Sequence, residues 1–132
     1  MYRCVKYCFI YGVNIIMNNE RFYKIKFSKI YPLLIQKAER KGRTKAEVDE
    51  IIYWLTGHNE QTLQSQLDAD VDVAQFYSQM PSYNPMADKI TGVICGHRVE
   101  TITDPLMKKI RQLDKLIDEL AKGKVMEKIL RK

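Results

Sequence analysis

The chain has 132 residues, of which 45% are hydrophobic and 29% charged, and its formal net charge at pH 7 is +6. This length predicts one domain with a modest core, and the composition excludes a disordered or fibrous protein. No apolar run reaches the roughly 20 residues that a membrane-spanning helix needs. We therefore expect a small soluble protein that does not enter a membrane.

The charges are segregated along the chain. Between Met17 and Lys45 there are nine basic and two acidic residues, whereas residues 46–88 contain eight acidic and no basic ones. From Lys89 to Lys132 the chain has eleven basic and six acidic residues. A nucleic-acid-binding surface needs basic charge without a competing acidic block, so this pattern argues against that role. It favours attraction between the blocks, within one fold or between two copies in a homodimer.

The first sixteen residues differ in character from the rest. They are apolar and aromatic and contain no acidic residue. A signal peptide needs an uninterrupted apolar run before a cleavage site, but Gly12 and Asn14 interrupt this run and no such site follows. We predict that residues 1–16 are an upstream leader outside the fold, that Met17 is the start, and that residues 17–132 form a single helical domain.

The first helix is expected shortly after this segment. Ser28 is a candidate N-cap, Pro32 falls in the first turn, and Gly42 ends a helix that reaches about Lys41. One face of this helix carries apolar residues at helical spacing, namely Ile30, Tyr31, Leu34 and Ala38.

A second helix follows after a short turn, and the two predict an αα-hairpin. Thr44 and Glu47 form a T-x-x-E capping box at its start, and Gly57 marks its end. This helix carries the acidic residues Asp49 and Glu50. Their negative charges would be repelled by the phosphates that surround a helix in a DNA groove. The helix pair is therefore not a simple helix-turn-helix reader.

Shorter elements are expected in the acidic middle of the chain. The segment from Asn59 to Leu67 predicts a short helix, and Asp70 or Asp72 caps another that carries Phe76, Tyr77 and Met80. The segment 81–85 has proline at both ends and predicts a turn.

The segment from Ile90 to Thr103 has two interpretations. Asn84 as N-cap and Pro85 as first residue predict a helix that places Gly92 and Gly96 on one face. The alternative is a β-hairpin whose two-residue turn begins at Gly96. We favour the helix, and the hairpin stays open.

The last helix has the clearest pattern. Asp104 is its N-cap, Pro105 its first residue and Gly123 its end. Apolar residues step by four and three along it, which predicts one wall of the core or a dimer face: Leu106, Ile110, Leu113, Ile117 and Leu120.

Few residues suggest chemistry. Cys4, Cys8 and Cys95 are too sparse for a disulfide framework and predict free thiols in a reducing, cytoplasmic compartment. Cys95 and Arg98 flank His97, and Arg98 would favour a thiolate, but a buried, inert cysteine is the more common situation. We therefore expect no catalytic residue here.

A small pocket is a separate possibility. Trp54 and His58 are four residues apart at the end of the second helix. With Cys95 and Arg98 they form our candidate pocket. We expect no metal site and no cofactor, because the sequence has neither a metal-ligand spacing nor a phosphate-binding loop.

Three stretches carry a family resemblance: KAERKGRTKAEVDEIIYWLTG, ITGVICGHRVE and DPLMKKIRQLDKLIDELAKGKVMEKILR. From about Arg21 to Lys132 the chain resembles the bacterial domain-of-unknown-function family 2200. The resemblance implies a small cytoplasmic bacterial protein without an established activity or cofactor, and it supports Met17 as the start. Tyr53, His97 and Gln112 stand at variable positions of that family, which argues against catalysis by His97.

These observations predict a mainly α protein, a small orthogonal bundle of about five to seven helices. The leading functional hypothesis is a self-associating or protein-partner-binding module. The alternative is a small-ligand-binding protein or enzyme with a pocket near Trp54, His58 and the segment 95–98. Nucleic-acid binding is third.

Overall fold

The computed structural model describes residues 19–131, and over this range the protein is mainly helical, as predicted. Seven α-helices, two short 3-10 helices and one two-stranded hairpin occur in that range. The expected leader and the start at Met17 lie outside it. In chain order the elements are α2 (Asn19–Tyr23), α3 (Phe27–Glu39), α4 (Lys45–Thr56), α5 (Glu60–Asp68), α6 (Val73–Ser78), η2 (Pro85–Lys89), β1 (Val93–Ile94), β2 (His97–Arg98), η3 (Val99–Thr101), α7 (Pro105–Ala121) and α8 (Met126–Ile129).

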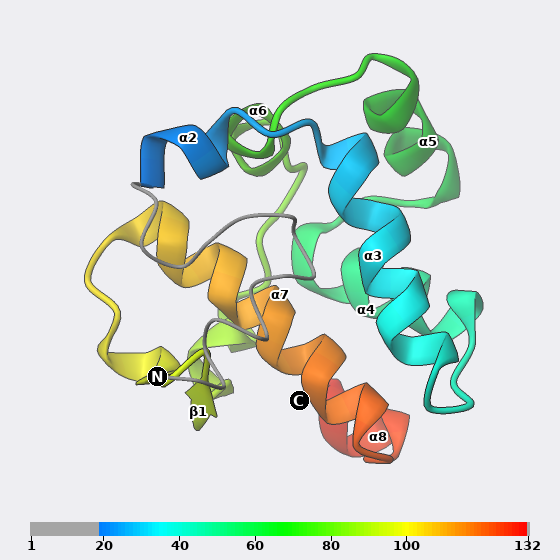
Figure 1. The fold of residues 1–132 in the computed structure, drawn as a ribbon, viewed down its shortest axis with the longest axis vertical. Helices are drawn as coiled ribbons and strands as arrows, with labels where there is room; N and C mark the ends of the chain where they lie inside the picture. The colour runs from blue at the N-terminus through cyan, green and yellow to red at the C-terminus, as the bar shows by residue number, and fades with distance from the viewer. Residues whose placement is uncertain (1–18, 132) are drawn as a thin grey trace.

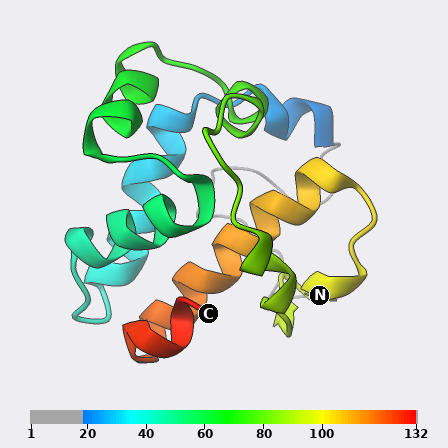
Figure 2. The same cartoon turned by 180° about the vertical axis from the view of Figure 1, so that it is seen from behind.

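Helix α7 is the centre of the molecule and runs diagonally across it (Figures 1 and 2). It contacts α3, α4, α6 and α8, and also the hairpin strand β1 and η3. Asp104 caps its start and Pro105 is its first residue, as predicted. Of the predicted apolar seam, Ile110, Leu113, Ile117 and Leu120 are buried in the core and Leu106 is partly buried. Leu116, which was not part of the prediction, is buried beside them. Burying each such side chain contributes about 1.5–3 kcal/mol, so this seam holds the fold together.

Helices α3 and α4 form the predicted αα-hairpin. The Thr44 side chain accepts a hydrogen bond from the Glu47 backbone, and the Glu47 carboxylate accepts one from the Thr44 backbone, which completes the capping box. Gly57 ends α4 in the left-handed conformation with a φ of 80°. A Cβ at this position would lie 2.8 Å from backbone atoms of Ser82, so the close approach of that segment also requires glycine.

The predicted start of α3 is wrong by two residues. The helix begins at Phe27, its N-cap is Lys26 without a side-chain cap, and Pro32 lies inside the helix rather than in its first turn. The Ser28 hydroxyl donates instead to Asp70 at 2.8 Å. Tertiary packing explains the difference, because the Phe27 ring stacks on Phe76 with centroids 3.7 Å apart.

The two middle helices follow the capping signals. Asn59 caps α5, and of the two aspartates proposed for the next helix it is Asp72 that caps α6. Leu63 and Phe76 bury their side chains in the core. Within the described part of the chain, none of the helices is long and apolar enough to span a membrane.

The favoured helix between Ile90 and Thr103 is wrong, and the alternative hairpin is present. Asn84 caps only the 3-10 helix η2, after which β1 and β2 pair with Ile94 opposite His97. The turn is Cys95-Gly96, one residue earlier than predicted. Both turn residues have positive φ, 54° and 79°, as a two-residue hairpin turn with right-handed strand twist requires. Cysteine is an uncommon choice for that conformation, so the sequence signal for the turn was weak.

Candidate functional site

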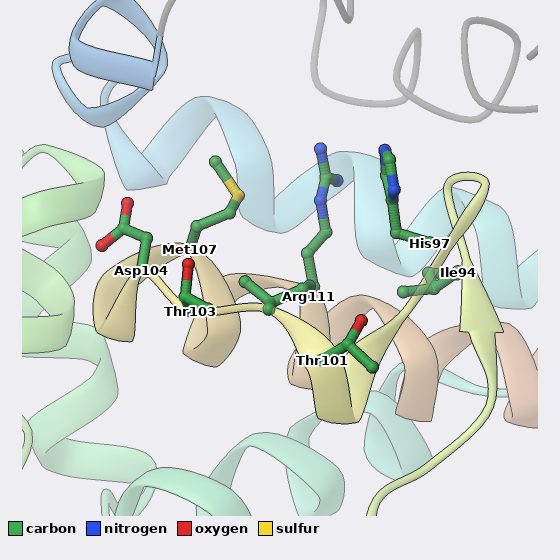
Figure 3. A pocket seen from close by; sticks show the side chains of 8 residues that line it. Ile94, His97, Thr101, Thr103, Asp104, Met107 and Arg111 are labelled. Atoms are coloured by element: carbon green, nitrogen blue, oxygen red, sulfur yellow. The ribbon is translucent and has the colours of Figure 1, made fainter.

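A hollow of about 360 Å³ lies between the first half of α7 and the hairpin with its following segment. This volume falls within the range of small-molecule pockets, about 300–1,000 Å³. Figure 3 shows the side chains that line it. We call it the α7 pocket, and its lining residues are Ile94, His97, Thr101, Ile102, Thr103, Asp104, Met107 and Arg111.

The α7 wall of this pocket comes from one helix face. Asp104, Met107 and Arg111 are spaced by three and four residues, so a helix places them on the same side. One Asp104 oxygen accepts the Leu106 backbone N–H at 3.2 Å, and the other accepts the Tyr23 hydroxyl at 2.5 Å. Burial and this hydrogen bond raise the pKa of Tyr23, so its hydroxyl remains the donor. The Asp104 carboxylate is therefore held in place from two sides.

Arg111 is held in place by a buried carboxyl group three residues further along α7. One guanidinium nitrogen of Arg111 donates to Asp114 at 2.8 Å, and Asp114 is fully buried. Burial raises the pKa of the Asp114 carboxyl, and the charge of nearby Asp118 raises it further. Figure 3 shows the side chains of Arg111, His97 and Met107 extending in the same direction. The guanidinium thus brings positive charge to the pocket wall beside His97.

The opposite wall is built by the hairpin and η3. Ile94 is buried at its base, and His97, its cross-strand partner, is exposed at the rim. Glu100 stabilises this wall, because its carboxylate accepts hydrogen bonds from the Gly92 backbone N–H at 3.1 Å and from the Arg98 side chain at 2.5 Å. Hydrogen bonds from its own backbone N–H, from Arg98 and from Gly92 lower the pKa of Glu100 to about 2. The wall is consequently tied together by a carboxylate that stays ionised.

The structure places the predicted Cys95 and Arg98 beside this pocket but not in its lining. Cys95 is buried and forms the first residue of the hairpin turn. Arg98 is exposed and pairs with Glu100. The residue between them in the predicted cluster, His97, is the one that lines the pocket.

Trp54 and His58 lie elsewhere and line a different part of the core. Trp54 is partly buried, and its backbone carbonyl accepts from Asn84 at 3.1 Å. His58 is buried, stacks on Phe76 with centroids 5.3 Å apart, and contacts the Thr62 hydroxyl through Nδ1 at 3.0 Å. Burial lowers the pKa of His58, which fits a neutral core histidine.

Sequence reasoning missed most of the pocket residues. The sequence predicts Asp104 as a helix cap only, and Met107 and Arg111 lie outside the apolar seam of the predicted helix. Their shared face is visible in the sequence once α7 is recognised. The opposing wall was hidden, because it depends on the hairpin.

A second hollow of about 240 Å³ lies on another side of the same half of α7. Its wall includes Tyr83, whose hydroxyl donates to Gln112, and Lys109, whose ammonium lies 5.1 Å from the Tyr83 ring centroid. This volume is below the usual range for small-molecule pockets. Within residues 19–131 no group of three or more His, Cys, Asp or Glu side chains is placed to hold a metal ion.

Fold and site together define a small, mainly α-helical domain with a polar hollow beside its central helix. The chain belongs to the domain-of-unknown-function family 2200, described as an uncharacterized protein conserved in bacteria, whose model matches residues 21–131. It is also similar to the crystal structure of the uncharacterized protein SP1917, with 45% sequence identity and a TM-score of 0.81. That similarity covers 87% of this chain and 93% of the other. No curated protein matches the chain.

Proposed function

We propose that this protein binds a small polar molecule in the α7 pocket. The observation that carries the proposal is the pocket itself, a hollow of about 360 Å³ whose two walls bring charged and polar side chains to one space. Binding sites of this kind combine apolar surface with a few fixed polar groups. Here Ile94, Ile102 and Met107 supply the apolar surface, and Asp104 and Arg111 are fixed by hydrogen bonds.

The structure gives self-association less support than the sequence did. Four of the five seam residues of α7 are buried inside the molecule and Leu106 is partly buried, which favours a core role for the seam over a dimer face. Part of the charge attraction is also satisfied locally, because Arg43 pairs with Glu47 and Lys45 with Asp49, both at 2.8 Å. Self-association stays a prediction, and light scattering that finds a monomer at both low and high salt would exclude it.

An amide NMR titration with a library of small polar molecules tests binding in the pocket. The expected result is at least one compound that shifts amide resonances of residues 101–111 in a saturable manner. A Thr101→Trp variant should abolish this binding, because Thr101 lines the pocket, is exposed, and leaves the core untouched. Thr91→Trp is the matched control at an exposed threonine outside the pocket lining. A library without any binder, or equal binding by both variants, would contradict the proposal.

A further inference from the structure

Between Asp104 and Arg111 the α7 pocket has an acidic side chain at one end and, at the other, a basic side chain that also pairs with Asp114. Asp104 lies at the start of α7 and Arg111 lies seven residues further along the same helix face. A helix rises 1.5 Å per residue, so their Cα atoms are about 10 Å apart along the axis. Figure 3 shows the two side chains separated along α7, with Met107 between them. A ligand that contacts both ends must therefore be elongated.

The space between the two charged side chains is bordered by Met107 on α7 and by Ile102 and Thr103 on the opposite wall. Ile94 lies further along, beside His97 (Figure 3). Methionine adapts its shape to a flexible aliphatic partner. An alkyl chain can therefore lie against Met107 and Ile102, while the exposed Thr103 hydroxyl beside them keeps its contact with water.

The polar groups at the two ends bind ligand groups of opposite charge. Asp104 is an acceptor when ionised, and its oxygens have acceptor capacity beyond the bonds from Leu106 and Tyr23. Arg111 is a donor only, and the exposed His97 of the opposite wall lies beside it in Figure 3. An ammonium suits the first end and a carboxylate the second.

We propose that the ligand of the α7 pocket is an elongated zwitterion, with its ammonium at Asp104, its carboxylate at Arg111 and an alkyl chain across Met107. This inference rests on the proposed small-molecule binding and specifies its chemical class. A short zwitterion such as glycine reaches only one of the two charged side chains, and a singly charged chain forms an ion pair with only one of them.

A series of four probes tests this on the full-length protein by isothermal titration calorimetry. ε-Aminocaproate carries both charges on a flexible chain, caproate lacks the ammonium, hexylamine lacks the carboxylate, and glycine lacks the length. Each charge-assisted hydrogen bond contributes about 1.5–3 kcal/mol, so ε-aminocaproate should bind at least about tenfold more tightly than each of the others. Equal or tighter binding of caproate, hexylamine or glycine overturns the zwitterion inference and leaves the proposed binding function intact.

A variant locates the ammonium. Asp104→Asn removes the charge but keeps a good N-cap, so α7 should start as before. Its affinity for ε-aminocaproate should fall about tenfold, with no loss of affinity for caproate. Asp68→Asn is the matched control, because Asp68 is an exposed carboxylate on α5 outside the pocket. Unchanged affinity of Asp104→Asn for ε-aminocaproate overturns the inference.

If none of the four probes binds while a library compound still shifts the amide resonances of residues 101–111, the zwitterion inference fails alone. If no library compound binds either, the proposed function fails with it.

Discussion

The two halves of α7 use their charged residues differently. In the last turns, Asp118 pairs with Lys37 and Lys122, and Glu119 pairs with Arg131 at 2.7 Å. In the first turns, Asp104 and Arg111 line a hollow of about 360 Å³. The first set joins α7 to α3 and to the end of the chain, whereas the second set borders space that a small molecule can occupy.

This contrast shows how one helix can serve both stability and binding. Arg43 illustrates the stabilising half, because one of its nitrogens donates to the backbone carbonyls of Leu120 at 3.1 Å and Lys124 at 2.9 Å. Leu120 lies in the last turn of α7 and Lys124 just beyond its end, so Arg43 adds to the bond that the Gly123 backbone N–H already donates to Leu120. A helix that is fixed so firmly at one end can hold pocket side chains in place at the other.

The largest expected effect is the loss of the Glu119 carboxylate. Glu119→Ala leaves Arg131 without its bidentate partner at a site where both side chains are largely buried. We expect a loss of about 3 kcal/mol in the free energy of unfolding, measured by urea denaturation. Arg131→Ala and the double variant complete a mutant cycle. A coupling energy near zero would show that this pair does not hold the end of α7.

A smaller loss is expected for Arg43→Lys. Lysine keeps the charge but lacks the planar fork that reaches two carbonyls and Glu47 together, so the free energy of unfolding should fall by about 2 kcal/mol. Lys45→Gln is the control, because Lys45 is exposed and the buried Asp49 keeps the hydrogen bond from the Tyr31 hydroxyl, so the loss should be about 1 kcal/mol. Equal losses in both variants would contradict the role given to Arg43.

Acidification should destabilise the fold through His58. Burial lowers its pKa in the folded state, so below the unfolded value of about 6.5 the unfolded chain binds a proton that the folded protein does not. Stability is therefore lost as the pH falls below that value, by at most about 1.4 kcal/mol per pH unit from this group. Thermal unfolding of the wild type and of His58→Gln across this range measures the effect. An identical pH dependence in both proteins would show that His58 is not the cause.

The smallest effect on stability and a clear effect on binding are expected for Tyr23→Phe. Its hydroxyl bonds to Asp104 at 2.5 Å and orients the carboxylate, so Tyr23 is a positioning residue for the pocket. We expect a loss of about 1 kcal/mol in unfolding free energy, and a weaker preference for ε-aminocaproate over caproate. A loss of stability with an unchanged preference for ε-aminocaproate over caproate would show that Tyr23 has only a structural role.

Much of the fold was predictable from local signals. The capping residues Thr44, Asn59 and Asp104 each begin a helix where the sequence predicts one, because a cap acts within its own turn. The start of α3 was not predictable in this way, since contacts of Phe27 with Phe76 and of Ser28 with Asp70 span more than forty residues.

The pocket was largely hidden from sequence reasoning for the same physical reason. Its α7 wall follows from helical spacing, but its second wall depends on a hairpin with an uncommon residue, Cys95, in the left-handed conformation. The predicted pair Trp54 and His58 has pocket-like chemistry, yet His58 is packed against Phe76. Residue type alone did not distinguish a core histidine from a pocket histidine.

The central claim is that the first half of α7 binds a ligand and the last half stabilises the fold. Its most direct test is an amide NMR titration of the protein with ε-aminocaproate. The account predicts saturable shifts at residues 101–111 and on the hairpin near His97, with the amides of Glu119 and Lys124 unmoved. No saturable shift at residues 101–111, or shifts centred on the end of α7, would contradict it.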